Sequence, residues 1–140
     1  MKFLYSTLAA IVLVSATANA KQITISEKSA VAASKAVGIT QASINGKLEH
    51  VLTDLKGMSV YTFDLDKKNT SNCKNGCLVE WPPVHVPANV KLQKPFASIK
   101  GNDGIAQLTV SGLPLYYYDD DKKVGDAFGN YPNWHSVIVK

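Results

Sequence analysis

Two aspartates that follow aromatic stretches are the first candidates for chemistry. Asp66 comes three residues after Phe63, and Asp121 comes three residues after Tyr118. Two neighbouring carboxylates can share a proton and act as acid and base. Neither loop contains Asp-Thr-Gly or Asp-Ser-Gly, as aspartic proteases do. We therefore interpret each carboxylate as a cap that accepts backbone N–H groups where the chain leaves a strand.

A metal site is a second possibility. The candidate ligands are His85, His135, Asp119 and Asp126. Carboxylate oxygens suit calcium, whereas imidazole and sulfur ligands suit copper or zinc. The acidic loop that starts at Asp64 has Asn69 where an EF-hand requires glycine, so we interpret its carboxylates first as solvated charge.

The two cysteines stand close together in Cys73-Lys-Asn-Gly-Cys77. In an oxidising compartment such a pair predicts a disulfide, which would withdraw both thiolates from any metal. Asn75-Gly76 supplies the tight turn that a small ring needs. Closing so short a loop stabilises the fold by only about 2 kcal/mol, so the bond shapes one loop. Cys-x-x-Cys-His is absent, which excludes a c-type haem at this place.

Signatures of other enzymes are missing from the sequence. It contains no His-Glu-x-x-His, no Gly-x-Ser-x-Gly and no glycine loop that would cradle a phosphate. We expect no enzymatic activity and no cofactor.

Residues 1–20 have the pattern of a cleavable signal peptide. Lys2 precedes an apolar run over residues 3–14, and small residues end in Ala18-Asn19-Ala20. The apolar run is shorter than the roughly 20 residues that cross a bilayer. We expect cleavage near Ala20, a periplasmic or secreted location, and no transmembrane segment in the mature chain. No cysteine follows the cleavage site, so no lipid anchor is expected.

The charge pattern argues against a nucleic-acid partner. All 15 basic residues are lysines, against 11 acidic residues, and the formal net charge is +4. Proteins that read nucleic acid usually use arginine forks and clustered basic stripes. The lysines here are scattered along an exported chain, so the expected partner is an unknown ligand of the envelope or extracellular space.

Turn signals divide the chain into short strands. Residues 21–37 are expected to be a linker or weakly ordered segment: residues 22–26 could form a short strand, and the small side chains of residues 27–37 predict a linker or weak helix that cannot anchor a core. From Gly38 onward, alternating runs separated by turn dipeptides are typical of an all-β protein. Asn45-Gly46 predicts a type I′ hairpin between residues 39–44 and 47–53. We expect at least six strands, little helix and a single β domain over residues 38–140.

An internal repeat organises this domain. Residues 57–68 align with residues 112–123, and Trp81 aligns with Trp134. The offset is 55 residues at Tyr61 and Tyr116 and 53 at the tryptophans, so one small deletion relates the halves. We place repeat one at about 48–88 and repeat two at about 103–140. The predicted fold is two pseudo-symmetric antiparallel β repeats packed as one small sandwich or partly closed barrel.

The spacing of the aromatic residues predicts which of them are buried. Tyr61 and Phe63, like Tyr116 and Tyr118, are two residues apart and therefore project from one face of a strand into a shared core. Tyr117 points the other way and is expected at the surface. We interpret the two tryptophans as core anchors, although an exposed aromatic platform could stack on a sugar ring or a protein partner.

The repeated residues carry a resemblance to a known family. They are Tyr61, Phe63, Asp66, Tyr116, Tyr118, Asp121, Trp81 and Trp134. This pattern resembles the bacterial secreted-repeat family of predicted lipoproteins, named for its Tyr-x-aromatic-x-x-Asp motif. The resemblance covers about residues 48–140 and implies envelope or secreted placement, tandem β repeats and no established catalytic residues. The chain departs from the family in lacking a lipidated cysteine.

Three functions remain open on the sequence. The leading hypothesis is an exported, non-enzymatic cell-envelope binding or structural module of unknown ligand. The alternatives are a periplasmic metal-binding protein that uses histidine and acidic loop residues, and a hydrolase without a recognisable signature.

Overall fold

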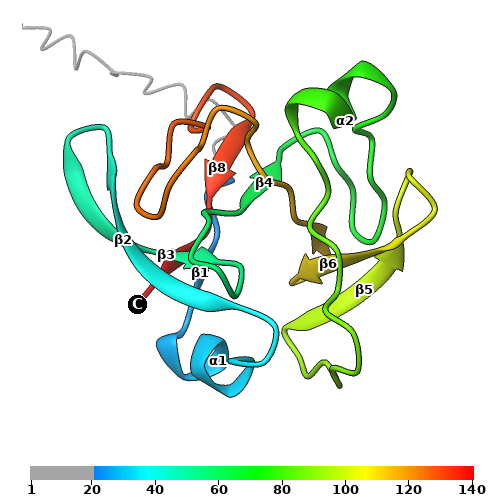
Figure 1. Ribbon diagram of the computed structural model, residues 1–140, viewed down its shortest axis with the longest axis horizontal. Coiled ribbons are helices and arrows are strands. Elements are labelled where there is room, and N and C mark those ends of the chain that lie inside the picture. The colour runs from blue at the N-terminus through cyan, green and yellow to red at the C-terminus, as the bar shows by residue number, and fades with distance from the viewer. Residues whose placement is uncertain (1–20) are drawn as a thin grey trace, which may run out of the picture.

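The computed structural model describes residues 21–140 (Figure 1). The predicted signal peptide over residues 1–20 lies outside the described residues. No helix in the described part is long and apolar enough to cross a membrane.

The largest sheet has four strands in the order β1-β9-β3-β2. Their bounds are β1 Thr24–Ile25, β2 Gly38–Ile44, β3 Lys47–Thr53 and β9 Ile138–Val139. β2 and β3 form an antiparallel hairpin in which Ile44 pairs with Lys47. Asn45 and Gly46 connect them with φ angles of 52° and 80°. Positive φ at both corners confirms the predicted hairpin turn.

Two smaller sheets complete the fold. β4 (Tyr61–Phe63) pairs with β8 (Trp134–Ser136), while β5 (Phe96–Lys100), β6 (Ala106–Val110) and β7 (Leu113–Pro114) form the third sheet. Figure 1 shows the β2–β3 and β5–β6 hairpins on opposite sides, with β4 and β8 between them. The sheets do not close on themselves, so the all-β class is confirmed and the architecture is a small sandwich.

The segment over residues 21–37 contains the possible short strand and a short helix, and it contributes to the core, which corrects the expectation of a linker that cannot anchor one. β1 pairs in parallel with β9, and helix α1 (Glu27–Ala32) follows it with Ser26 as its N-cap. Ala30, Ala36 and Val37 are buried in the main aliphatic cluster. Small side chains add little apolar area, but they let this backbone approach the sheet closely.

The core of residues 21–140 comprises a main aliphatic cluster, an aromatic cluster and a smaller aliphatic cluster that contains Val51 and Ile138. The main aliphatic cluster includes Leu52, Leu108 and Val137, whereas the aromatic cluster is built from the buried tyrosines and tryptophans of the repeats. Tyr117 packs against the main aliphatic cluster, and its hydroxyl donates to Asp54 Oδ2 over 2.8 Å. Because this hydrogen bond satisfies the phenol, the ring is half-buried and not exposed as expected.

Candidate functional site

The two repeats meet at Tyr61 and Tyr116. The N–H of Tyr61 donates to the carbonyl of Tyr116 over 2.8 Å, and the N–H of Tyr116 donates back over 2.9 Å. Both residues are fully buried. Since they occupy equivalent positions in the two repeats, this reciprocal antiparallel bridge lies on the pseudo-two-fold axis.

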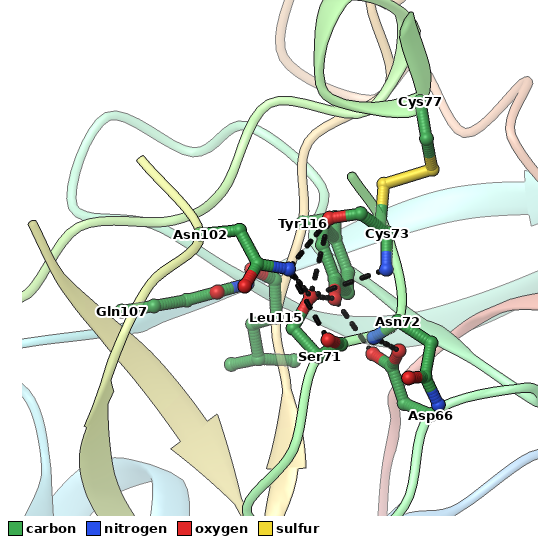
Figure 2. The surroundings of a disulfide bond; sticks show 9 residues. All are labelled: Asp66, Ser71, Asn72, Cys73, Cys77, Asn102, Gln107, Leu115 and Tyr116. Carbon is green, nitrogen blue, oxygen red and sulfur yellow. Dashed lines mark hydrogen bonds between the residues drawn. A yellow bond between two sulfur atoms is a disulfide. The ribbon is translucent and has the colours of Figure 1, made fainter. Parts of the chain in front are cut away.

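Across this axis, the tyrosine of each repeat forms a hydrogen bond with the aspartate of the other repeat. The Tyr61 hydroxyl donates to Asp121 Oδ2 over 2.5 Å, and the Tyr116 hydroxyl donates to Asp66 Oδ2 over 2.7 Å (Figure 2 shows the second pair). Each tyrosine therefore satisfies the aspartate of the other repeat. The sequence motif is completed only when the two copies pack together.

Each aspartate also caps its own loop. Asp66 Oδ1 accepts the N–H of Asn72 over 2.6 Å, and Asp121 Oδ1 accepts the N–H of Phe128 over 2.9 Å. These are the backbone contacts expected from the sequence. The sequence did not reveal that these aspartates bind the tyrosine hydroxyls. The one indication in the sequence was that each aspartate follows the tyrosine of its own repeat by the same number of residues.

Burial sets the protonation behaviour of these pairs. It raises the pKa of Asp66 to about 6, although the hydrogen bonds from Asn72 and Tyr116 act in the opposite direction. Burial likewise raises the pKa of Asp121 against the hydrogen bond from Tyr61. Among the described residues no hydrogen bond joins the two carboxylates, so the geometry is not that of a dyad sharing one proton.

Four aromatic rings form a row through the centre of the interface, and they too alternate between repeats. Phe63 stacks on Trp134 with ring centroids 4.1 Å apart, and Trp134 stacks on Trp81 at 3.7 Å. Tyr118 packs against Trp81 at 4.6 Å with its ring tilted by 42°. The two indole planes differ by only 2°. Trp81 and Trp134 are 4% and 8% exposed, as expected of core anchors.

The bridging tyrosines complete this cluster. Tyr61 meets Trp81 edge-on at 5.6 Å, and Tyr116 meets Trp134 edge-on at 5.3 Å. All eight repeated residues predicted as the motif therefore belong to one structure, which we call the aromatic interface. It comprises Tyr61, Phe63, Asp66, Trp81, Tyr116, Tyr118, Asp121 and Trp134.

One end of the aromatic interface reaches the surface. The Tyr118 hydroxyl lies 3.0 Å from that of Tyr131, whose side chain is 49% exposed. Phe128 in the same loop is 63% exposed. The N–H of Gly129 donates to the Tyr61 hydroxyl over 3.2 Å, so the interface holds the backbone of this loop.

The predicted disulfide joins Cys73 to Cys77 beside the Tyr116–Asp66 pair (Figure 2). Cys73 is fully buried. Asn102 from outside the loop donates its amide to the carbonyl of Cys73 over 2.9 Å. The bond shapes the first loop next to the interface, as its short spacing indicated.

The structure does not bring the metal candidates together. His85 pairs with Asp103 over 2.6 Å, and His135 pairs with Asp64 over 2.9 Å. The His85 hydrogen bond lowers the pKa of Asp103. Within residues 21–140 no group of three histidine, cysteine or acidic side chains is placed to hold an ion.

The two acidic candidates have local partners instead. Asp126 Oδ2 accepts the N–H groups of Lys122 and Lys123 over 2.9 and 3.0 Å. Asp119 is exposed, and its carbonyl accepts the Lys122 ammonium over 2.7 Å. Their positions therefore follow from turn formation.

Comparison with known proteins agrees with the duplication. A family model described as a secreted repeat of unknown function matches residues 42–85 and again residues 97–137. No curated protein and no solved structure matches the chain. Each matched segment contains four residues of the aromatic interface, which are Tyr61, Phe63, Asp66 and Trp81 in the first and Tyr116, Tyr118, Asp121 and Trp134 in the second.

Proposed function

We propose that this chain, which belongs to the family of secreted repeats, is an exported, non-enzymatic module that binds a polysaccharide of the cell envelope. The family description supports export and leaves the activity open. The ligand class is argued from the surface beside the aromatic interface.

The observation that carries the proposal is the loop over residues 126–133. It exposes the rings of Phe128 and Tyr131, yet its backbone is fixed by Asp121 and by the Tyr61 hydroxyl. Rings on a rigid backbone offer a large contact area at small entropic cost. Such rings suit the flat apolar face of a sugar.

The carboxylates support a binding role over catalysis. Asp66 and Asp121 each use one oxygen for a tyrosine and the other for a backbone N–H. A general acid or base must reach the proton that it transfers. These carboxylates are instead committed to holding the two repeats and their loops in place.

The test is binding of the secreted protein to purified envelope polysaccharide. We expect the double variant F128A/Y131A to weaken binding about tenfold or more, as loss of two aromatic anchors does elsewhere. The matched control is L48A/I105A, because Leu48 and Ile105 are 68% and 51% exposed on other segments.

Two results would contradict the proposal. One is equal binding by the two double variants. The other is failure of the folded wild-type protein to bind any polysaccharide fraction of the envelope. Sequencing the N-terminus of the secreted protein would test cleavage near Ala20 in the same preparation.

A further inference from the structure

A continuous path of oxidisable rings leads from the surface into the aromatic interface. Tyr131 is half exposed, and its ring centroid lies 5.6 Å from that of Tyr118. Tyr118 packs on Trp81 at 4.6 Å, and Trp81 on Trp134 at 3.7 Å. Tyrosine and tryptophan are the aromatic side chains that lose an electron most readily. Rings in contact allow that electron vacancy to move from one ring to the next.

The path ends at two tyrosines that each have a proton acceptor in place. Tyr61 lies 5.6 Å from Trp81, and Tyr116 lies 5.3 Å from Trp134. An oxidised phenol is strongly acidic, so tyrosine is oxidised most easily when its proton can leave at the same time. The hydroxyls are 2.5 Å from Asp121 Oδ2 and 2.7 Å from Asp66 Oδ2, which provides this transfer without rearrangement.

We propose that the aromatic interface is a trap for one-electron oxidants that the exported protein meets outside the cytoplasm. The oxidant takes an electron from Tyr131 and is reduced. The vacancy passes through Tyr118 and the tryptophans to Tyr61 or Tyr116. That tyrosine becomes a neutral radical, and its phenolic proton moves to the carboxylate of Asp121 or Asp66. One electron and one proton leave the phenol, so the step is balanced.

The raised pKa of Asp66, about 6, is consistent with this use because it makes the carboxylate a better proton acceptor than an exposed one. Burial of both end tyrosines also protects a radical from coupling with a second molecule. The trap shares Tyr131 with the proposed polysaccharide site. It requires no bound polysaccharide, however, because it depends on ring contacts within the protein, and Y61F/Y116F tests it with both exposed rings in place.

The chain contains a matched control. Tyr117 also donates its hydroxyl to a carboxylate, that of Asp54, over 2.8 Å. No ring pair within the described part of the chain includes Tyr117. Tyr117 therefore has a proton acceptor but no contact with the path of oxidisable rings. The Y117F variant should leave the trap intact.

The experiment oxidises the whole secreted protein with photogenerated ruthenium(III) tris-bipyridine. Transient absorption and electron paramagnetic resonance then follow the tryptophan and tyrosine radicals. In the wild type and in Y117F we expect a tryptophan radical that converts to a long-lived tyrosyl radical. In Y131F the tyrosyl radical should form several-fold more slowly, and in Y61F/Y116F its long-lived component should be lost.

Near-UV circular dichroism establishes that each variant is folded. If Y61F/Y116F does not fold, D66N/D121N replaces it, because removing both proton acceptors should leave the vacancy on tryptophan. The proposal is overturned if the wild-type tryptophan radical decays without forming a tyrosyl radical. It is also overturned if a folded Y61F/Y116F gives the same long-lived tyrosyl signal as the wild type.

Discussion

The loops that follow Asp66 and Asp121 each lead the chain to a tryptophan of the aromatic interface, but different bonds hold the two loops in place. After Asp66, a disulfide closes the chain and the short helix α2 (Gly76–Glu80) leads to Trp81. After Asp121, the corresponding stretch over residues 122–133 has no cysteine and relies on hydrogen bonds. Asp126 accepts two backbone N–H groups there, and Asn130 binds the N–H and hydroxyl of Ser136.

The difference shows which features the fold requires. Both loops must place an aspartate opposite the other repeat's tyrosine and deliver a tryptophan to the central row of rings. A loop closed by a disulfide and a loop held by hydrogen bonds alone both meet this requirement. Only the second loop, however, presents two exposed aromatic rings, so the two halves are equivalent inside and different at the surface.

Replacing one glycine by alanine in each loop should give the largest difference in stability between the two loops. A Cβ at Gly129 would lie 2.8 Å from two atoms of the Tyr61 ring and 3.0 Å from Trp81, whereas one at Gly76 would meet nothing within 4 Å. We expect G129A to lower the free energy of unfolding by about 3 kcal/mol through overpacking. G76A should change it by less than about 0.5 kcal/mol. Urea titration gives both values, and similar losses in the two variants would contradict the assigned packing.

The two tyrosine hydroxyls should differ in their effect on stability. Asp121 is 7% exposed, and Y61F leaves its Oδ2 and the N–H of Gly129 without a partner, a loss of about 2 to 3 kcal/mol. Asp66 is only partly buried, so Y116F should cost about 1 kcal/mol. Chemical unfolding of both variants at neutral pH measures the difference. A larger loss in Y116F would show that the first loop, not the second, depends more on the hydrogen bond between repeats.

Reducing the disulfide should have a moderate effect confined to the first loop. Opening a ring of this length costs about 2 kcal/mol of stability on the chain-entropy account. The C73S/C77S variant, compared with the reduced wild type, separates loss of the bond from the effect of the reductant. Hydrogen exchange should increase over residues 71–80 and stay unchanged over residues 126–133. Equal changes in both loops would mean that the disulfide supports the whole interface.

The pH dependence of stability should reveal Asp66. Its pKa is about 6 in the folded protein against an ordinary 3.8, so the folded state holds the extra proton between these values. The contribution of Asp66 to the free energy of unfolding is fully present below pH 3.8 and is lost as the pH rises through about 6. Solvent screening limits this contribution to about 1 kcal/mol or less. D66N should flatten this part of the unfolding profile. D103N is the control, because the lowered pKa of Asp103 acts below pH 3.8 and in the opposite sense.

Much of the fold was predictable because the signals were local. Asn45-Gly46 specified its hairpin, and the spacing of Cys73 and Cys77 specified their bond. The burial of both tryptophans also followed from the repeat. The prediction failed for the burial of residues 27–37, because small side chains gave no apolar signal and their burial depends on the sheet that they approach. It failed for Tyr117 because its partner, Asp54, is distant in the sequence.

The sequence by itself determined that two copies of one pattern make this protein, since repetition and turn residues are written along the chain. Only the tertiary structure decided that each tyrosine serves the aspartate of the opposite copy. The physical reason is that equal spacing within each repeat fits a pairing inside one copy as well as a pairing between copies. Packing about the pseudo-two-fold axis selects the second arrangement.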